Sequence, residues 1–215
     1  MNSTPKGIFI DFDGTLINAF EAIILAWQET LSFFGHELYS GEKIRRMTGK
    51  NDTSFAGIFG QENEKKARQI FYDTHDKVHL KHLQILEGAE ELLLGFKQKN
   101  IPVVLLTNKV ESCAVQQVSH LGWQHYFDHI IGAVPHRPSK PDPTGLLLGC
   151  QHIQQQAQNC LMIGDGLNDM QVAKHTGCTA IGICADFNAQ ELKEAGATHC
   201  FNNLNEVHTW LNPIN

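Results

Sequence analysis

The chain of 215 residues is long enough to bury a hydrophobic core, either as one large domain or as one domain with an insertion. Its content of 42% hydrophobic and 19% charged residues is typical of a globular protein. The 17 basic and 23 acidic residues give a net charge of -6, which argues against nucleic acid as the main partner because phosphate backbones bind basic surfaces.

The cysteines and the apolar segments indicate the cellular compartment. None of the six cysteines forms a C-x-x-C pair, and several lie in apolar runs, where cysteine usually serves as a small hydrophobe. We therefore expect reduced thiols in a cytoplasmic protein. The N-terminal residues carry no basic-then-apolar leader, and no apolar run is long enough to span a membrane. We expect a soluble protein that binds no membrane and is a monomer or a homodimer.

Residues 7–16 read G-I-F-I-D-F-D-G-T-L, an apolar run that ends in two acids. If the run is a strand, its period of two directs the carboxylates of Asp11 and Asp13 to the same side. Two carboxylates that close repel each other, so one must be protonated or a cation must lie between them. Gly14 lets a ligand approach the backbone, and Thr15 offers a hydroxyl and an N–H. Together these groups suggest phosphoryl chemistry.

The segment after the first motif has a helical pattern. Apolar residues recur at helical spacing from Ile17 to Phe34, and Ser40 is a candidate cap for the next helix. Further helices are expected at 40–47, 54–59 and 64–80. No convincing strand is visible between Leu16 and Ile85, so we predict an all-helical insertion.

Three histidines in this insertion share one helical face. His75, His79 and His82 fall at positions i, i+4 and i+7, a spacing that could suggest a metal site. Residues 76, 77 and 81 are charged, however, so a solvated helix face is the simpler interpretation.

From residue 87 onward, strands and helices alternate. Strands rich in Val, Ile and Leu are expected at 101–106, 129–134, 160–163 and 179–184. This alternation predicts an α/β protein with a doubly wound parallel sheet covered by helices on both faces. We predict a core domain formed by 1–16 and 87–215, with a helical cap domain inserted at 17–86.

Polar residues follow each of these strands. Thr107 and Asn108 follow I-P-V-V-L-L, Lys140 lies in a proline-rich loop, and Asp165 and Asp169 follow C-L-M-I-G. In open parallel sheets, ligands bind beyond the carboxyl ends of the strands. We therefore expect these residues to share one pocket with the two acids of the first strand.

The residue types in this pocket suit phosphate ester hydrolysis. Asp11 would attack phosphorus and form an acyl-phosphate. Asp13 would donate a proton to the leaving oxygen and later accept one from water. Asp11 and Asp165, with a backbone carbonyl, would hold Mg²⁺, which offsets the repulsion between carboxylates and phosphate. The equatorial phosphate oxygens would be held by Lys140, Thr107 and the N–H of Asn108.

Four motifs in this order resemble those of the haloacid dehalogenase superfamily, namely D-F-D-G-T-L at 11–16, T-N-K at 107–109, K-P at 140–141 and G-D-G-L-N-D at 164–169. The helical insertion looks like the α-helical cap of the phosphoglycolate phosphatase-like branch. The resemblance implies a Rossmann-like core with Asp11 as nucleophile and Asp13 as acid and base. It implies Mg²⁺ ligation by Asp11, by Asp165 and by the carbonyl of Asp13. It also implies phosphate contacts from Thr107, Asn108 and Lys140, with Asp169 orienting the metal waters or Lys140.

The cap offers one candidate substrate contact. In enzymes that this chain resembles, a cap loop near Lys50 reaches the active site, so Lys50 is either a substrate contact or a solvated residue. The chain departs from the branch at Asn18-Ala19 and at Gly166, and neither departure removes a catalytic group.

The function predicted from these residues is a Mg²⁺-dependent phosphatase acting on a small phosphorylated metabolite, with phosphoglycolate as the leading substrate. One alternative is a sugar phosphomutase that uses the same aspartyl-phosphate. A phosphonoacetaldehyde hydrolase fits less well, because Asp13 is out of place in the first motif of that enzyme. The alternative from another class is a non-catalytic regulatory or binding module that retains the fold. The intact acids and Lys140 argue against that module.

Overall fold

The computed structural model describes residues 4–48 and 55–211. The chain divides into two compact units, which we call the core unit (Met1–Ile17 with Ile85–Asn215) and the inserted unit (Asn18–Gln84). The boundaries differ by one or two residues from those expected from the sequence pattern. No helix within the described residues is long and apolar enough to cross a lipid bilayer.

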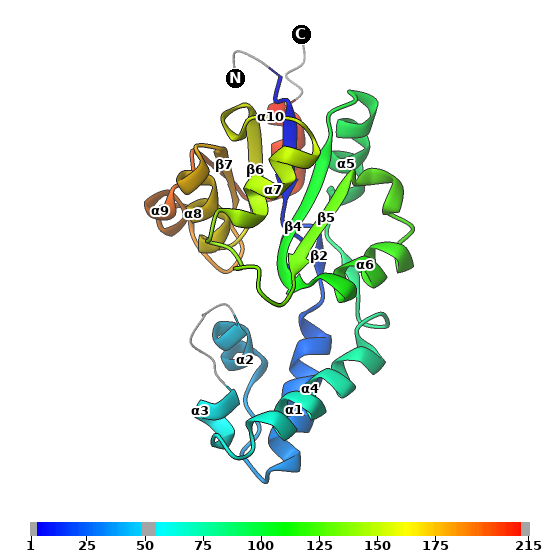
Figure 1. Cartoon of the computed structure of the whole chain (residues 1–215), viewed down its shortest axis with the longest axis vertical. Helices are drawn as coiled ribbons and strands as arrows, with labels where there is room; N and C mark the ends of the chain where they lie inside the picture. The colour runs from blue at the N-terminus through cyan, green and yellow to red at the C-terminus, as the bar shows by residue number, and fades with distance from the viewer. Residues whose placement is uncertain (1–3, 49–54, 212–215) are drawn as a thin grey trace. The chain divides into compact units, whose positions relative to one another are not determined.

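The core unit contains a six-stranded sheet in the order β5-β4-β1-β6-β7-β8 (Figure 1). All neighbouring strands pair in parallel, which confirms the predicted parallel α/β sheet. The strands are β1 (Gly7–Ile10), β4 (Val103–Val110), β5 (His129–Ala133), β6 (Cys160–Gly164), β7 (Thr179–Ile183) and β8 (His199–Phe201). Because β1 lies between β4 and β6, the first motif follows a central strand.

Helices cover both faces of this sheet. One face carries α5 (Ala89–Gln98), α6 (Glu111–His120) and α10 (Leu204–Leu211), and the other carries α7 (Thr144–His152), α8 (Leu167–Thr176) and α9 (Ala189–Ala195). Short 3-10 turns lie at Gln124–Tyr126 and Ala157–Asn159. On the α7–α8 face, Phe9 packs in a buried cluster with Leu106, Ile131, Met162 and Met170. Ile8 and Ile10 are equally buried and, by the period of two, face the opposite helices.

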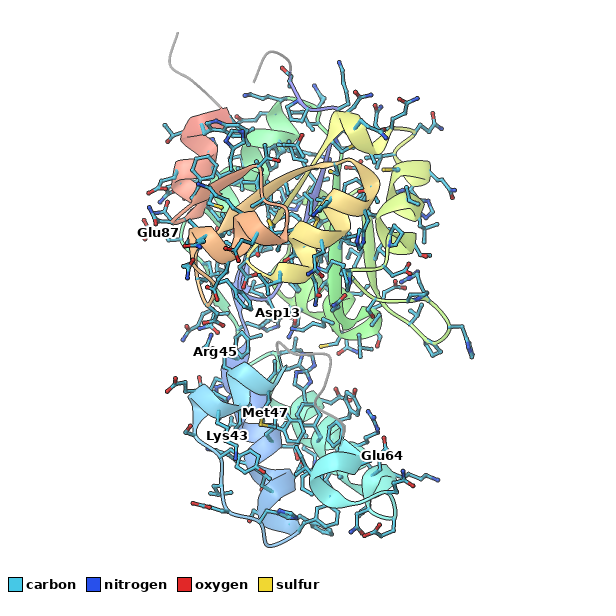
Figure 2. The ribbon with its side chains drawn as sticks, turned by 90° about the vertical axis from the view of Figure 1, so that its left-hand side faces the viewer. Asp13, Lys43, Arg45, Met47, Glu64 and Glu87 are labelled. Atoms are coloured by element: carbon cyan, nitrogen blue, oxygen red, sulfur yellow. The ribbon has the colours of Figure 1, made fainter. Side chains whose placement is uncertain are left out.

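The inserted unit is built from α1 (Phe20–Phe33), α2 (Gly41–Thr48), α3 (Phe55–Phe59) and α4 (Glu64–Val78). Its core is aromatic, since Trp27 stacks on Phe55 with ring centroids 4.8 Å apart. The side chain of Ser40 accepts a hydrogen bond from the N–H of Lys43 at 3.2 Å, as expected for the cap of α2. Figure 2 labels Lys43 and Arg45 along this helix, where they lie over the rings of Tyr39 and Phe20.

Two short strands, β2 (Ile17–Asn18) and β3 (Gln84–Ile85), pair where the chain leaves and re-enters the core unit. The expectation that no strand lies between Leu16 and Ile85 is therefore wrong. Two-residue strands are too short to produce a periodic pattern, so the sequence carried no signal for them.

The interpretation of the histidine face is also wrong. His75 and His79 are only 7% and 1% exposed, and their rings stack in parallel with centroids 5.1 Å apart. Nδ1 of His82 instead lies 3.0 Å from a carboxylate oxygen of Glu21. Residues i and i+4 share a helix face whereas residues i+1 and i+2 do not, so the charged neighbours did not report on the environment of the histidines.

Candidate active site

The first motif lies directly beyond the end of β1. Asp11 and Asp13 flank Phe12, whose side chain is fully buried and fixes the turn. Gly14 has a left-handed backbone with φ of +84°, and a Cβ atom there would collide with the carboxylate of Asp165. Glycine therefore allows the first motif and the segment after β6 to come into contact.

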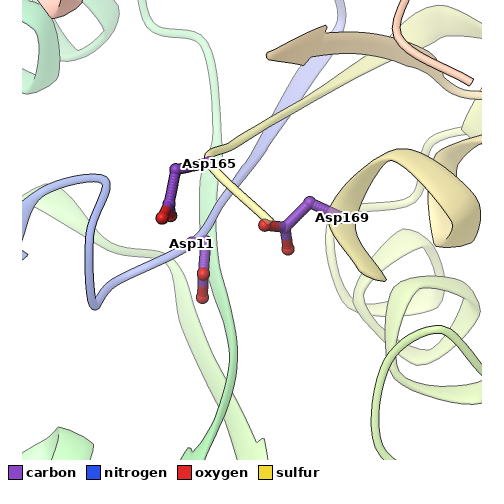
Figure 3. Close-up of side chains that lie close together, drawn as sticks. All are labelled: Asp11, Asp165 and Asp169. Carbon is purple, nitrogen blue, oxygen red and sulfur yellow. The ribbon is translucent and has the colours of Figure 1, made fainter. Parts of the chain in front are cut away.

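Three carboxylates converge at this point (Figure 3). Asp11, Asp165 and Asp169 each offer an oxygen atom, and these atoms lie within 4.8 Å of one another. The hydroxyl of Thr15, which is buried, donates a 2.8 Å hydrogen bond to Oδ1 of Asp165. The structure thus brings together Asp11 and Asp165, the two side chains expected to hold a metal, and places Asp169 beside them.

Lys140 is a cation that contacts two of these carboxylates, and it is only 5% exposed. Its Nζ lies 2.8 Å from Oδ1 of Asp11, 2.6 Å from Oδ1 of Asp169 and 2.8 Å from the carbonyl oxygen of Leu106. Burial disfavours the ammonium, but the carboxylates of Asp11 and Asp169 outweigh burial and hold the pKa of Lys140 above its usual range. Lys140 is therefore positively charged at neutral pH.

The pKa values of the acids are raised as well, which for a carboxyl group favours the neutral form. Burial, together with repulsion from Asp11, raises the pKa of Asp169 to about 6, although Lys140 opposes the shift. The second oxygen of Asp169 accepts a 3.0 Å hydrogen bond from the N–H of Gly166. Burial and the nearby carboxylates of Asp11 and Asp169 also raise the pKa of Asp165. Burial raises the pKa of Asp13, against the attraction of Lys109.

The donor set fits a divalent cation with a preference for oxygen ligands. With Asp13, the site holds four carboxyl groups against the two ammonium groups of Lys109 and Lys140, so it has an excess of two negative charges when all four are ionised. Oδ1 of Asp11 is buried and accepts no hydrogen bond of good geometry from the described residues, although Lys140 lies close to it. A buried carboxylate oxygen of this kind is suited to a hard metal ion.

The second motif lies within a strand rather than after one. The prediction ended the strand at residue 106, but β4 continues through Thr107, Asn108 and Lys109 to Val110. Its pairing with β5 shifts register between Leu106 and Val110. An irregularity of this kind changes the direction in which the strand's side chains point. It leaves no pattern of apolar residues by which the sequence would reveal it.

Asn108 makes a contact that the sequence pattern did not indicate. Its side-chain amide donates to the carbonyl oxygen of Lys140 at 2.9 Å and accepts from the N–H of Lys140 at 2.8 Å. These two bonds fix the backbone of the lysine in its loop. Thr107 is buried beside it, and its hydroxyl accepts the N–H of Lys109 at 3.1 Å.

Lys109 is a site residue to which the sequence assigned no role. Its Nζ lies 2.8 Å from Oδ1 of Asp13 and 2.7 Å from Oε1 of Gln117 on α6. A signal was available, because Lys109 directly follows Thr107-Asn108. The cap candidate Lys50 lies outside the described residues.

Comparisons with known proteins agree with this geometry. The family described as haloacid dehalogenase-like hydrolase matches residues 8–183. The chain is 29% identical to the phosphoglycolate phosphatase of Photobacterium profundum over 198 residues, which cover 85% of each chain. It is 23% identical to that of Psychrobacter arcticus over 217 residues, which cover 95% of this chain and 94% of the relative. The fold is also that of a solved structure, the haloacid dehalogenase-like family hydrolase SP0104 from Streptococcus pneumoniae, with a TM-score of 0.87. The two chains are 24% identical, and the match covers 99% of this chain and 100% of that chain.

Proposed function

Because the chain belongs to the haloacid dehalogenase-like hydrolase family, we propose that it is a Mg²⁺-dependent phosphatase that acts on a small phosphomonoester through an aspartyl-phosphate. The observation that carries this proposal is the convergence of Asp11, Asp165 and Asp169, two of which, Asp11 and Asp169, also contact the buried ammonium of Lys140. The carboxylates can hold a metal cation while the ammonium binds the phosphate of the substrate beside it, as phosphoryl transfer requires.

Asp11 is the proposed nucleophile. Its carboxylate would attack phosphorus and divide one difficult hydrolysis into two easier steps. Asp11, Asp165 and the carbonyl of Asp13 are the proposed ligands of Mg²⁺, which when bound offsets negative charge and polarises the phosphoryl group. Both oxygens of Asp169 are already bonded, to Lys140 and to Gly166, which supports an orienting role for this residue.

Asp13 is the proposed acid and base. Its raised pKa favours a carboxyl group that holds a proton to give to the leaving oxygen, after which the carboxylate takes a proton from the attacking water. Lys140, Thr107 and the N–H of Asn108 are the proposed contacts of the equatorial phosphate oxygens, where charge accumulates in the transition state.

The leading substrate is phosphoglycolate, because the relatives compared above carry that substrate in their names. A small acidic ester is also consistent with a site that presents a permanently charged lysine. The inserted unit is the proposed source of substrate selectivity.

The test is phosphate release from a panel of small phosphate esters, including phosphoglycolate and p-nitrophenyl phosphate, with Mg²⁺ and with EDTA. We expect release that depends on Mg²⁺ and that Asp11→Asn abolishes while the protein remains folded. Turnover by Asp11→Asn at the wild-type rate would disprove the nucleophile. Isomerised sugar phosphate in place of free phosphate would identify a phosphomutase, and no release from any ester would favour a non-catalytic module.

A further inference from the structure

A second buried lysine, Lys109, contacts the first motif at Asp13. Lys109 is 7% exposed at its side chain, and its Nζ lies 2.8 Å from Oδ1 of Asp13. The side chain of Asp13 is 20% exposed, and the residue follows β1, which ends at Ile10. The contact joins the central strand β1 to its neighbour β4 through side chains rather than through the sheet hydrogen bonds.

The ammonium of Lys109 is itself held in place from two directions. Oε1 of Gln117, a fully buried residue of α6, lies 2.7 Å from Nζ. The same Nζ lies 5.6 Å from the centroid of the buried Phe12 ring. A surface lysine would move freely and contribute little to an ion pair, whereas this ammonium has a fixed position.

The contact engages only one of the two oxygens of Asp13. Within the described residues, Oδ1 accepts from Lys109 and Oδ2 accepts no hydrogen bond. A carboxyl group that carries its proton on Oδ2 keeps Oδ1 as an acceptor. Lys109 can therefore hold Asp13 in the same orientation whether Asp13 is protonated or ionised.

We propose that Lys109 is the positioning residue for Asp13, and that it fixes Oδ1 so that Oδ2 alone exchanges the proton in both halves of the reaction. This inference rests on the proposed function. In the first half, a bond forms between Asp11 and phosphorus while the P–O bond to the alcohol breaks, and the proton moves from Oδ2 of Asp13 to the departing oxygen. In the second half, water attacks phosphorus, the bond to Asp11 breaks to release phosphate and the Asp11 carboxylate, and Oδ2 of Asp13 takes the proton from the water. Lys109 gains and loses no proton in either half.

The first experiment compares two substrates with different leaving groups. Phosphoglycolate releases an alkoxide that needs a proton, whereas p-nitrophenyl phosphate releases a stable phenolate that needs little assistance. For Lys109→Met we expect kcat/KM for phosphoglycolate to fall by roughly tenfold or more relative to kcat/KM for p-nitrophenyl phosphate. Lys109→Arg should restore part of this ratio, because it keeps the charge, and Lys97→Met, on the exposed surface of α5, should leave the ratio unchanged.

The second experiment does not depend on activity. Melting temperatures of Lys109→Met, Asp13→Asn and the double variant form a double-mutant cycle in the metal-free protein. Loss of Lys109 leaves the charge of Asp13 without its partner, so the double variant should be more stable than the sum of the two single effects predicts. If Lys109→Met does not fold, Gln117→Met removes the anchor, keeps Lys109 and should shift the substrate ratio in the same direction.

The outcomes separate this inference from the proposed function. A wild-type protein that releases phosphate, with a substrate ratio that Lys109→Met leaves unchanged, overturns the role of Lys109 alone. Additive melting temperatures overturn it as well. A wild-type protein that hydrolyses neither ester overturns the proposed function and the inference with it.

Discussion

The two units of the molecule bury very different kinds of side chain. The core unit buries charges beside its sheet, and each is paired, as Lys140 is with Asp11 and Asp169. The inserted unit buries aromatic rings around Trp27 together with the stacked pair His75 and His79. A buried charge is unfavourable unless an opposite charge compensates it. In the core unit, the compensated charges lie at the candidate active site. Substitutions in the core unit should therefore change activity most, whereas substitutions in the inserted unit should change the free energy of unfolding.

The largest effect is expected from removal of the central ammonium. Lys140→Met takes away the group that holds Asp11 and Asp169 together and that would face the phosphate oxygens. We expect kcat to fall by roughly a hundred- to a thousand-fold, the effect of losing one electrostatic donor in an active site. Steady-state kinetics with p-nitrophenyl phosphate measures the loss. Full activity of Lys140→Met would show that the ammonium of Lys140 contributes to stability and not to catalysis.

A smaller effect is expected from the residue that fixes the lysine backbone. Asn108→Ala removes both hydrogen bonds to Lys140 but keeps the N–H of residue 108. A displacement of about 1 Å in a reacting group can cost a hundred-fold in rate, so we expect kcat to fall by roughly ten- to a hundred-fold with a smaller change in KM. Asn108→Asp is the matched control, since it keeps the acceptor for the N–H of Lys140. An unchanged kcat for Asn108→Ala would mean that the loop holds Lys140 by itself.

The pH dependence of stability gives a test of the carboxylates in the metal-free protein. The pKa of Asp169 rises from 3.8 to about 6 on folding, so the folded state binds this proton more tightly than the unfolded state. The stability that this proton supplies is present below the lower value and is lost as pH rises through the higher one. We expect the melting temperature in EDTA to fall across this interval, and Asp169→Asn to flatten the slope.

Added Mg²⁺ should reverse that loss, because a cation binds the ionised carboxylates and stabilises only the folded state. The rise in melting temperature on adding Mg²⁺ should be larger at about pH 7.5 than at about pH 5. An equal rise at both values would contradict cation binding by these acids.

The smallest effect is expected in the inserted unit. Trp27 stacks on Phe55, but its indole N–H is buried and has no hydrogen-bond partner among the described residues. Trp27→Phe keeps a ring in the stack and removes the unsatisfied donor, so the two effects on the free energy of unfolding should nearly cancel. Trp27→Ala leaves a cavity and should cost about 3–5 kcal/mol. Chemical denaturation measures the free energy of unfolding of both variants. A loss for Trp27→Phe as large as the loss for Trp27→Ala would contradict an indole N–H without a partner.

Much of the core unit could be predicted from local patterns. The strands rich in Val, Ile and Leu indicated the parallel sheet, and the polar residues after them indicated that Asp11, Lys140 and Asp165 share one place. These features are readable because a buried parallel strand has a composition of its own, and because the ends of parallel strands meet at one edge.

The remaining site contacts depend on tertiary structure. The two hydrogen bonds from Asn108 to Lys140 and the contact from Lys109 to Asp13 come from the part of β4 where the register shifts. No short-range pattern encodes such a shift. The burial of His75 and His79 also depends on tertiary structure, because charged neighbours on other faces of a helix carry no information about the face that these histidines share.

The pairing of β2 with β3 has a consequence for protein engineering. The insertion leaves the core unit at Asn18 and returns at Gln84, and the side-chain amides of these residues lie 3.4 Å apart. Adjacent strands are separated by about 4.8 Å, a gap that a tight two-residue turn can close. We therefore expect that a short connection at this junction can replace the insertion without any change to the central strands.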